Sequence, residues 1–124
     1  MRNMDSETGA VEFTSPLGNA WGIWMGTQRP DPGTYHVEFE IPEQVDSWVP
    51  SEVPAGRIEG EQQGHTQQVS VSGIVENVDD DFMVTLRVGT DVILVEMAPS
   101  APAVHKGEPI TFSAATLELY PYQL

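Results

Sequence analysis

The chain of 124 residues contains no cysteine, which excludes thiol catalysis, disulfides and cysteine-based zinc sites. It also has little positive charge: five Lys and Arg stand against 19 Asp and Glu, so the formal net charge is −14 with histidine neutral. A polyanion of this density repels phosphate backbones and anionic membrane surfaces, and it attracts basic proteins and cations. We therefore expect neither nucleic-acid binding nor membrane-surface binding, and the class of partner narrows to positively charged molecules.

Long hydrophobic runs are missing as well. The longest aliphatic run is Val92–Val95, far shorter than the roughly 20 residues that a membrane-spanning helix needs. No apolar stretch follows Arg2, so we expect no signal peptide. Hydrophobic residues still make up 40% of the chain, enough to condense into a core, and the length fits one domain. These observations predict a globular cytoplasmic protein.

Glycine and proline, 11 and 10 residues, divide the chain into segments too short for many helices. Apolar and polar residues alternate in several of these segments, which is typical of half-buried strands. The run 92–97 is nearly continuous in apolar residues and predicts a strand covered on both faces. We expect a bulge at Gly73 and a bend at Ala114–Ala115, where the alternation changes phase. The expected strands cover residues 35–41, 69–78, 82–88, 92–97 and 110–120.

These strands predict an all-β fold: a small antiparallel barrel of five to six strands, OB-like in form. A sandwich is the competing arrangement and needs one or two further strands. We expect residues 1–15 to be a flexible amino-terminal segment and residues 16–124 to be a single β-barrel domain. A long loop at about 42–67 is expected, with its second half exposed and poorly ordered. Residues 16–26 are expected to pack on the barrel as a short extra strand, and the aromatic residues expected to face the core are Tyr35, Phe39, Phe82 and Phe112.

Three histidines and a run of aspartates are the candidates for metal binding. His36, His65 and His105 lie far apart, so no two of them form the local ligand pair typical of structural zinc sites. Asp79–Asp81 are consecutive in a predicted turn and cannot all converge on one ion, while Asp91 belongs to the turn at the other end of the next strand. We therefore expect no metal and no other cofactor, and interpret the aspartates as a solvated turn.

Paired carboxylates are the main candidates for catalysis. Glu38 and Glu40 are two residues apart on one face of a predicted strand, a spacing that suits general acid and base chemistry. No basic residue, nucleophile or glycine-rich loop stands near them, and Ser70 and Ser72 belong to no catalytic motif. The sequence therefore does not predict an enzyme.

The negative charge is concentrated in the middle of the chain. Residues 31–97 carry 14 Asp and Glu against two Arg, a net charge of −12, whereas both ends are nearly neutral. Clustered charge of one sign costs stability through self-repulsion, so a specific use is expected, with plain solubility as the alternative. Trp48 in the same region is a candidate interface anchor. The candidate partner-binding residues are Glu38, Glu40, Glu43, Asp46, Trp48, Glu76, Asp79, Asp80 and Asp81.

Several short segments resemble a loose group of small acidic bacterial proteins. These segments are Trp21–Gly26, Gly33–Ile41, Val71–Glu76, Leu86–Gly89 and Ile93–Glu96. That group is similar in style to immunity proteins encoded beside secreted toxins, and the similarity covers about residues 16–120. The resemblance implies a stoichiometric inhibitor of a toxin domain, without catalysis or a cofactor. It assigns no individual site residue.

Two classes of binding function follow from these observations. The leading hypothesis is a non-catalytic protein that neutralises a basic toxin domain, of the nuclease type, by placing an acidic face in its substrate cleft. The alternative is an OB-like module that binds an oligosaccharide or a nucleic acid; the charge argues against nucleic acid, whereas exposed tryptophans can stack on sugar rings. A homomeric scaffold is a third hypothesis, so a monomer and a small homo-oligomer both stay open.

Overall fold

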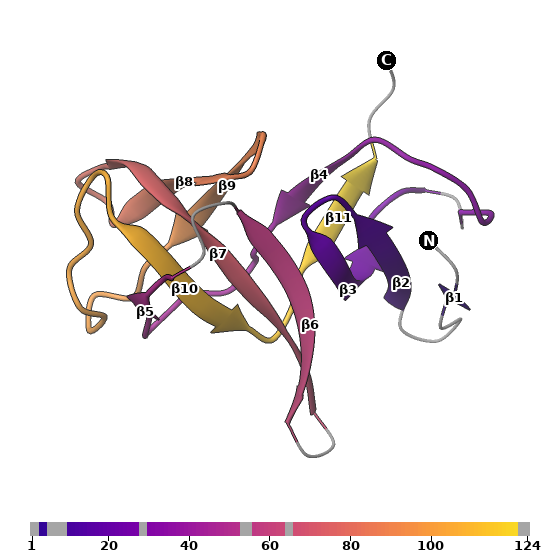
Figure 1. Ribbon diagram of the computed structural model, residues 1–124, viewed down its shortest axis with the longest axis horizontal. Helices are drawn as coiled ribbons and strands as arrows, with labels where there is room; N and C mark the ends of the chain where they lie inside the picture. The colour runs from indigo at the N-terminus through magenta and orange to yellow at the C-terminus, as the bar shows by residue number, and fades with distance from the viewer. Residues whose placement is uncertain (1–2, 5–9, 28–29, 53–55, 64–65, 122–124) are drawn as a thin grey trace.

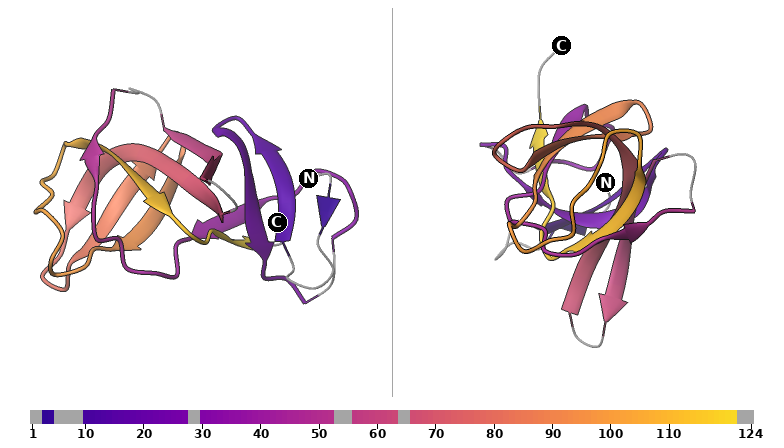
Figure 2. Two further views of the ribbon diagram at one scale, coloured as in Figure 1. Left: turned by 90° about the horizontal axis from the view of Figure 1, so that it is seen from below. Right: turned by 90° about the vertical axis from the view of Figure 1, so that its left-hand side faces the viewer.

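The computed structural model describes residues 3–4, 10–27, 30–52, 56–63 and 66–121. In these ranges the chain forms strands, turns and loops with no helix, which confirms the all-β class. The strands pair into two sheets, which follow one another along the long axis of the molecule (Figures 1 and 2). None of the described segments is a helix long and apolar enough to cross a membrane.

The first sheet contains five strands: β1 (Asn3–Met4), β2 (Ala10–Ser15), β3 (Gly18–Trp24), β4 (Val37–Glu40) and β11 (Glu118–Pro121). Their order in the sheet is β1-β2-β3-β11-β4. β2 and β3 form an antiparallel hairpin, β11 pairs with β3 in parallel, and β4 pairs with β11 antiparallel. β4 is therefore the last strand on its side of the sheet.

The second sheet contains β5 (Val49–Pro50), β6 (Arg57–Gln63), β7 (Thr66–Val78), β8 (Met83–Val88), β9 (Asp91–Glu96) and β10 (Pro109–Ala114). Its order is β5-β10-β7-β8-β9, and β6 also pairs with β7. β7, β8 and β9 form a meander from three of the strands that the sequence predicts, with the turn at Asp79–Asp81 between β7 and β8. The β8–β9 turn has Gly89 at φ 63°, as a two-residue hairpin turn with glycine in first place requires.

β7 is the central strand of the second sheet. One of its edges pairs with β10, whereas the other pairs first with β6 and then, beyond Gly73, with β8. Gly73 is buried, and a Cβ atom there would lie 2.5 Å from the carbonyl oxygen of Arg87. The bulge that we expected at Gly73 lies instead at Glu76, where the register with β8 shifts between Val75 and Asn77. Glycine is required at position 73 because the β8 backbone approaches closely there.

The chain changes sheets between β10 and β11. The phase change in the sequence predicted a bend at Ala114–Ala115, and the structure confirms it: β10 ends at Ala114, and β11 begins at Glu118 in the other sheet. The N–H of Ile23 donates to the Leu117 carbonyl at 2.8 Å, which holds the start of this second part against β3. This short connection is one of the links between the two sheets.

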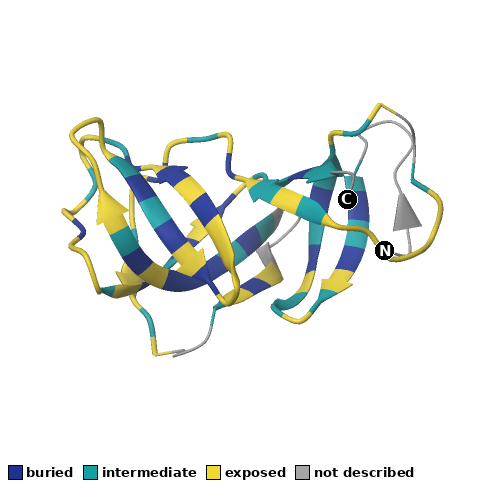
Figure 3. Cartoon of the chain, turned by 90° about the horizontal axis from the view of Figure 1, so that it is seen from above, coloured by how far each residue is buried: buried dark blue, intermediate teal, exposed yellow. Residues whose placement is uncertain are grey.

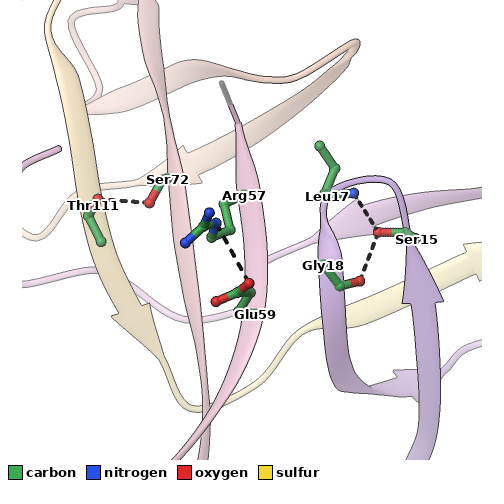
Figure 4. A network of polar contacts seen from close by, with 7 residues as sticks. All are labelled: Ser15, Leu17, Gly18, Arg57, Glu59, Ser72 and Thr111. Atoms are coloured by element: carbon green, nitrogen blue, oxygen red, sulfur yellow. Dashed lines mark hydrogen bonds and ion pairs between the residues drawn. The ribbon is translucent and has the colours of Figure 1, made fainter. Parts of the chain in front are cut away.

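A second contact between the sheets joins the β2–β3 turn to β6, and Figure 4 shows the residues of this turn beside that strand. The N–H of Ile58 donates to the carbonyl of Leu17 at 3.0 Å. The Ser15 hydroxyl stabilises the turn, since it accepts from the Leu17 N–H at 3.1 Å and donates to the Gly18 carbonyl at 3.2 Å. Gly18 has φ 140°, and a side chain there would collide with the Ile58 carbonyl oxygen. Glycine therefore permits the turn to rest on β6.

One hydrophobic core extends through both sheets (Figure 3). It takes alternate residues from the strands, because successive side chains of a strand point to opposite faces. Where the core carries a polar group, that group is paired: the Ser72 and Thr111 hydroxyls lie 2.8 Å apart. The largest fully buried side chains are Ile58, Leu86, Ile93, Ile110, Leu117 and Leu119.

The aromatic residues that we expected in the core divide into two pairs. Phe112 is 3% exposed, and Phe39 is half-buried against Phe13. Phe82 is 51% exposed, because the turn before β8 places it at φ 63° and turns its side chain out of the strand alternation. Tyr35 is 38% exposed in the segment before β4, where its ring packs edge-on against Trp24. The expectation was wrong for Phe82 and Tyr35, which lie outside the regular strands.

Two regions that we expected to be flexible contain strands. Residues 10–15 of the expected flexible segment form β2, with Val11 and Phe13 buried. The expected loop at 42–67 contains β5 and β6, and β6 pairs with β7 along its whole length. Its polar composition misled the prediction, since pairing supplies the backbone hydrogen bonds whatever the side chains are. Residues 1–2, 5–9, 53–55 and 64–65 lie outside the described residues.

The closed barrel is not confirmed. The pairings among the described residues leave two open sheets, whose outer strands include β4 and β9. The pair β3–β11 is parallel, so the expected fully antiparallel arrangement is wrong at that point. The extra strand expected within residues 16–26 is present as β3.

Replacing Gly73 with alanine tests the close approach of β7 and β8. We expect Gly73→Ala to lower the free energy of unfolding by about 1–3 kcal/mol, since the new methyl group overpacks a buried backbone contact. Gly60→Ala is the matched control: it also lies in a paired strand, but its nearest neighbour would be 3.4 Å from the new Cβ atom. Urea unfolding of both variants measures the effect. Equal stability of Gly73→Ala and the unmodified chain would contradict the packing argument.

Candidate functional site

Each sheet ends in a strand with one open edge, and the two open edges face each other. β4 ends the first sheet and β9 ends the second, and within the described residues no pairing joins them. Between them lies a groove of about 710 Å³. In Figure 1, β4 lies between β11 and β9. The residues that line the groove are Val37, Glu38, Phe39, Glu40, Thr90, Asp91, Val92, Leu94 and Tyr120.

The backbone of β9 directs hydrogen-bonding groups into the groove. The N–H of Met97 donates to the carbonyl of Phe82, just before β8, at 2.9 Å. The backbone N–H and C=O groups of Val95 and Ile93, at alternate positions before Met97, therefore point towards β8 as well. The N–H and C=O groups of Val92 and Leu94 therefore point away from β8. Their side chains are 50% and 58% exposed. β9 thus presents both unpaired backbone groups and apolar surface.

The backbone of β4 also directs hydrogen-bonding groups into the groove, from the side opposite β9. The carbonyls of Leu117 and Leu119 accept hydrogen bonds from β3 and its following residue Met25. The backbone N–H and C=O groups of Glu118 and Tyr120 therefore point towards β4, where these two residues lie opposite Glu40 and Glu38. The N–H and C=O groups of Val37 and Phe39 therefore face away from β11. Pro121, which has no N–H to give, lies opposite Val37 and agrees with this assignment.

The groove is closed at one end. Beyond β4, Val45 pairs with Met97 in parallel. The Val45 N–H donates to the Glu96 carbonyl at 2.9 Å, and the Ala98 N–H donates to the Val45 carbonyl at 2.8 Å. β4 and β9 therefore run in the same direction, and the groove lies on the amino-terminal side of this bridge.

Carboxylates surround the groove. Glu38, Glu40 and Asp91 line it, and the described lining residues include no Lys, Arg or His. Arg87 lies behind β9, opposite Val92 in the β8–β9 ladder, and its guanidinium forms an ion pair with a carboxylate of its own sheet. A concave surface with one sign of charge and apolar walls concentrates the electric field, so it attracts cations.

Tyr120 extends this negative region onto the face of β11. Its hydroxyl donates to the Glu118 carboxylate at 3.0 Å. That hydrogen bond raises the pKa of Tyr120 above its ordinary value of 10.0, and burial and the negative charges of Glu118 and Glu40 act in the same direction. The surface beside the groove therefore disfavours any further negative charge.

Two of the predicted partner-binding residues stabilise loops. The Glu43 carboxylate accepts a hydrogen bond from the Thr116 N–H at 2.9 Å, which fastens the segment after β4 to the β10–β11 connection. The Trp48 indole N–H donates to the Pro102 carbonyl at 2.9 Å, and its ring packs against the core. Both side chains are half-buried and take part in the fold.

The other predicted acids lie away from the groove. Asp79–Asp81 form the turn at the far end of β8 from the β8–β9 turn. Asp79 Oδ1 accepts from the N–H groups of Asp81 at 2.9 Å and Met83 at 3.1 Å, so it holds this turn together. Glu76 forms its ion pair with Arg87. Exposed Asp46 follows the bridge residue Val45. The acids that we expected to form one acidic face are therefore divided between the two ends of the meander.

The sequence prediction missed the residues on the β9 side of the groove. The apolar run 92–97 suggested a strand covered on both faces, but Val92 and Leu94 are exposed, so that expectation was wrong. The available signal was Asp91 just before the run and Glu96 within it, because charged residues are a common feature of edge strands.

The described residues contain no group of three or more His, Asp and Glu side chains arranged to hold a metal ion. His105 Nδ1 lies 2.9 Å from Glu108 Oε1, within one short turn. His36 is exposed in the segment before β4. His65 lies outside the described residues.

Removing the Asp79 side chain tests its role in the turn. We expect Asp79→Ala to lower the free energy of unfolding by about 1 kcal/mol, since two backbone N–H groups lose their acceptor. Asp79→Asn removes the same charge but keeps an acceptor oxygen, and should retain most of the stability. Urea unfolding separates the two variants. Equal losses in both would show that charge, rather than the hydrogen bonds, matters at this position.

Replacing Glu118 with glutamine tests the cause of the Tyr120 shift. We expect Glu118→Gln to lower the pKa of Tyr120 towards 10.0, followed by phenolate absorbance, with Tyr120→Phe to identify its signal. Because the folded state holds this proton more tightly than the unfolded chain, its contribution to stability is present below pH 10 and is lost as pH rises through the raised pKa. Glu52→Gln, a distant charge loss, is the control. An unchanged titration in Glu118→Gln would refute the assigned cause.

Comparison with models of protein families, with curated proteins and with solved structures finds no match for this chain.

Proposed function

We propose that this chain is a non-catalytic binding protein that neutralises a basic protein domain, in the manner of immunity proteins that inhibit toxins encoded beside them. One observation carries the proposal: among the described residues, the groove between β4 and β9 combines three carboxylates with exposed aliphatic side chains and has no lining Lys, Arg or His. The carboxylates are those of Glu38, Glu40 and Asp91. A site of this composition fits a protein surface that is basic and partly apolar.

The aliphatic part of the groove favours a protein over a simple cation. Val92 and Leu94 expose half or more of their surface beside charged residues, and apolar surface ringed by polar groups marks protein interfaces. The net charge of −14 accelerates encounter with a basic partner and makes association sensitive to salt.

A nuclease-type toxin domain is the partner class that this chemistry suits best. A nuclease cleft binds phosphates through Lys and Arg side chains, so a carboxylate-lined surface competes for the same groups. The proposal includes an OB-like barrel, which is supported by the Val45–Met97 bridge. Continued pairing from that bridge along β4 and β9 would join the two sheets along the side where the groove lies.

Co-expression with the product of the neighbouring upstream gene tests this function. We expect that product to be toxic alone and harmless together with this chain. The double variant Glu38→Gln/Glu40→Gln should bind it at least tenfold more weakly and with a shallower salt dependence, because two exposed carboxylates leave the groove while the fold keeps its contacts. Growth assays and titration calorimetry at two salt concentrations measure these effects.

The control is Asp80→Asn/Asp81→Asn, which removes two exposed charges at the far end of β8. It should leave affinity within about twofold at physiological salt, where the Debye length is about 8 Å. Equal weakening by both double variants would mean that total charge, and no particular surface, drives binding. A neighbouring product that is harmless alone, or that stays toxic in the presence of this chain, would overturn the inhibitor function.

A further inference from the structure

β4 and β9 lie too close together for a strand of the partner to enter between them. Residue pairs of the two strands lie within 8 Å of each other, measured between Cα atoms. An inserted strand would need edges roughly 10 Å apart, because neighbouring strands lie about 4.8 Å from each other. A ligand at this place therefore meets the side chains on the outer faces of β4 and β9.

These side chains form an aliphatic strip with an acidic border. Val92 and Leu94 of β9 are 50% and 58% exposed. They line the groove together with Glu38 and Glu40, which are exposed on β4. Alternate residues of a strand share a face, so each pair presents two like side chains in a row along its strand. The strip of Val92 and Leu94 therefore has carboxylates on its β4 side.

On its β8 side the strip has a border without net charge. Arg87 and Thr85 lie directly opposite Val92 and Leu94 in the β8–β9 ladder, so their side chains share the outer face. Arg87 forms an ion pair with Glu76 of β7, which offsets its charge. The aliphatic stem of an arginine adds apolar surface beside such a strip. A ligand thus meets carboxylates on one flank only.

An α-helix is the element that suits such a face. The face of a sheet offers side chains and no backbone hydrogen bonds, so a bound segment must satisfy its own backbone groups, as a helix does. A helix with its side chains is about 10 Å wide, roughly two strand spacings, so one lying along β9 reaches β4 and β8. Helix residues four apart are separated by about 6 Å along the axis, close to the roughly 6.7 Å between alternate strand residues.

We propose that the outer face of β9 binds an amphipathic α-helix of the partner. An aliphatic stripe of this helix packs over Val92 and Leu94, and its Lys or Arg residues lie on the one flank beside Glu38 and Glu40. This inference rests on the proposed function and specifies which part of the partner is recognised. A second copy of this chain is a poor occupant, because its described residues form no helix and its net charge is −14.

Two peptides of equal composition test the pattern. Both are alanine-based helices of 18 residues with blocked ends and four Leu in one stripe, since shorter helices are marginal in water. The first carries four Lys about 100° round the helix from the stripe, and the second has each Lys moved one position along, to the side opposite the stripe. Fluorescence anisotropy should show at least fivefold tighter binding of the first peptide to the full chain. Circular dichroism should show that its helix content rises on binding.

Variants of exposed aliphatic residues test the face itself. Leu94→Thr removes apolar surface from the strip and introduces a residue that suits strands. Val49→Thr is the matched control, because Val49 is 59% exposed on β5, at the opposite end of the same sheet. We expect Leu94→Thr to weaken binding of the first peptide at least fivefold and Val49→Thr no more than twofold. Should urea unfolding show that Leu94→Thr does not fold, Val92→Thr makes the same test.

The outcomes separate this inference from the function on which it rests. Equal binding of the two peptides, lost in Glu38→Gln/Glu40→Gln but kept in Leu94→Thr, would overturn the helix-binding face and leave an acidic binding surface. Binding of the first peptide without a gain of helix would overturn it as well. Absence of any peptide binding, together with a toxic neighbouring product that this chain still neutralises, would also refute the inference. The expected peptide binding, beside a neighbouring product that is harmless alone, would support the face and overturn the inhibitor function only.

Discussion

The second sheet depends on the close approach of the β7 and β8 backbones at Gly73. Because no side chain stands between them, β7 can leave β6 and take up β8 on the same edge while β10 stays paired on the other. The meander of β7, β8 and β9 then places β9 beside β4. The place of β9 beside β4 therefore depends on the point at which β7 begins to pair with β8.

Much of the fold could be predicted from alternation, and the failures have a common physical cause. The meander and the bend at Ala114–Ala115 followed from side-chain periodicity, which reports which face of a strand is buried. β6 was missed because its polar residues show little contrast between faces, although its backbone is fully paired. Phe82 was misplaced because a left-handed turn residue breaks the alternation. The periodicity of side chains indicates which residues of a strand are buried, but it does not indicate which other strand pairs with it.

The same distinction explains what could be predicted of the candidate site. Glu38 and Glu40 were identifiable, because carboxylates on the exposed phase of a strand face solvent in any sheet. Val92 and Leu94 were not, since an apolar run suggests burial until the sheet order shows that β9 is an edge. The acidic residues also differ in structural role, since the carboxylates of Asp79 and Glu43 accept backbone hydrogen bonds. A count of charges in the sequence does not distinguish such residues from acids whose carboxylates are free to bind a partner.

The Val45–Met97 bridge fixes one end of the groove. Its two backbone hydrogen bonds join the chain just beyond the carboxyl ends of β4 and β9. Any motion that changes the width of the groove therefore has this bridge as its pivot, and the change in width is largest towards the amino ends of the two strands.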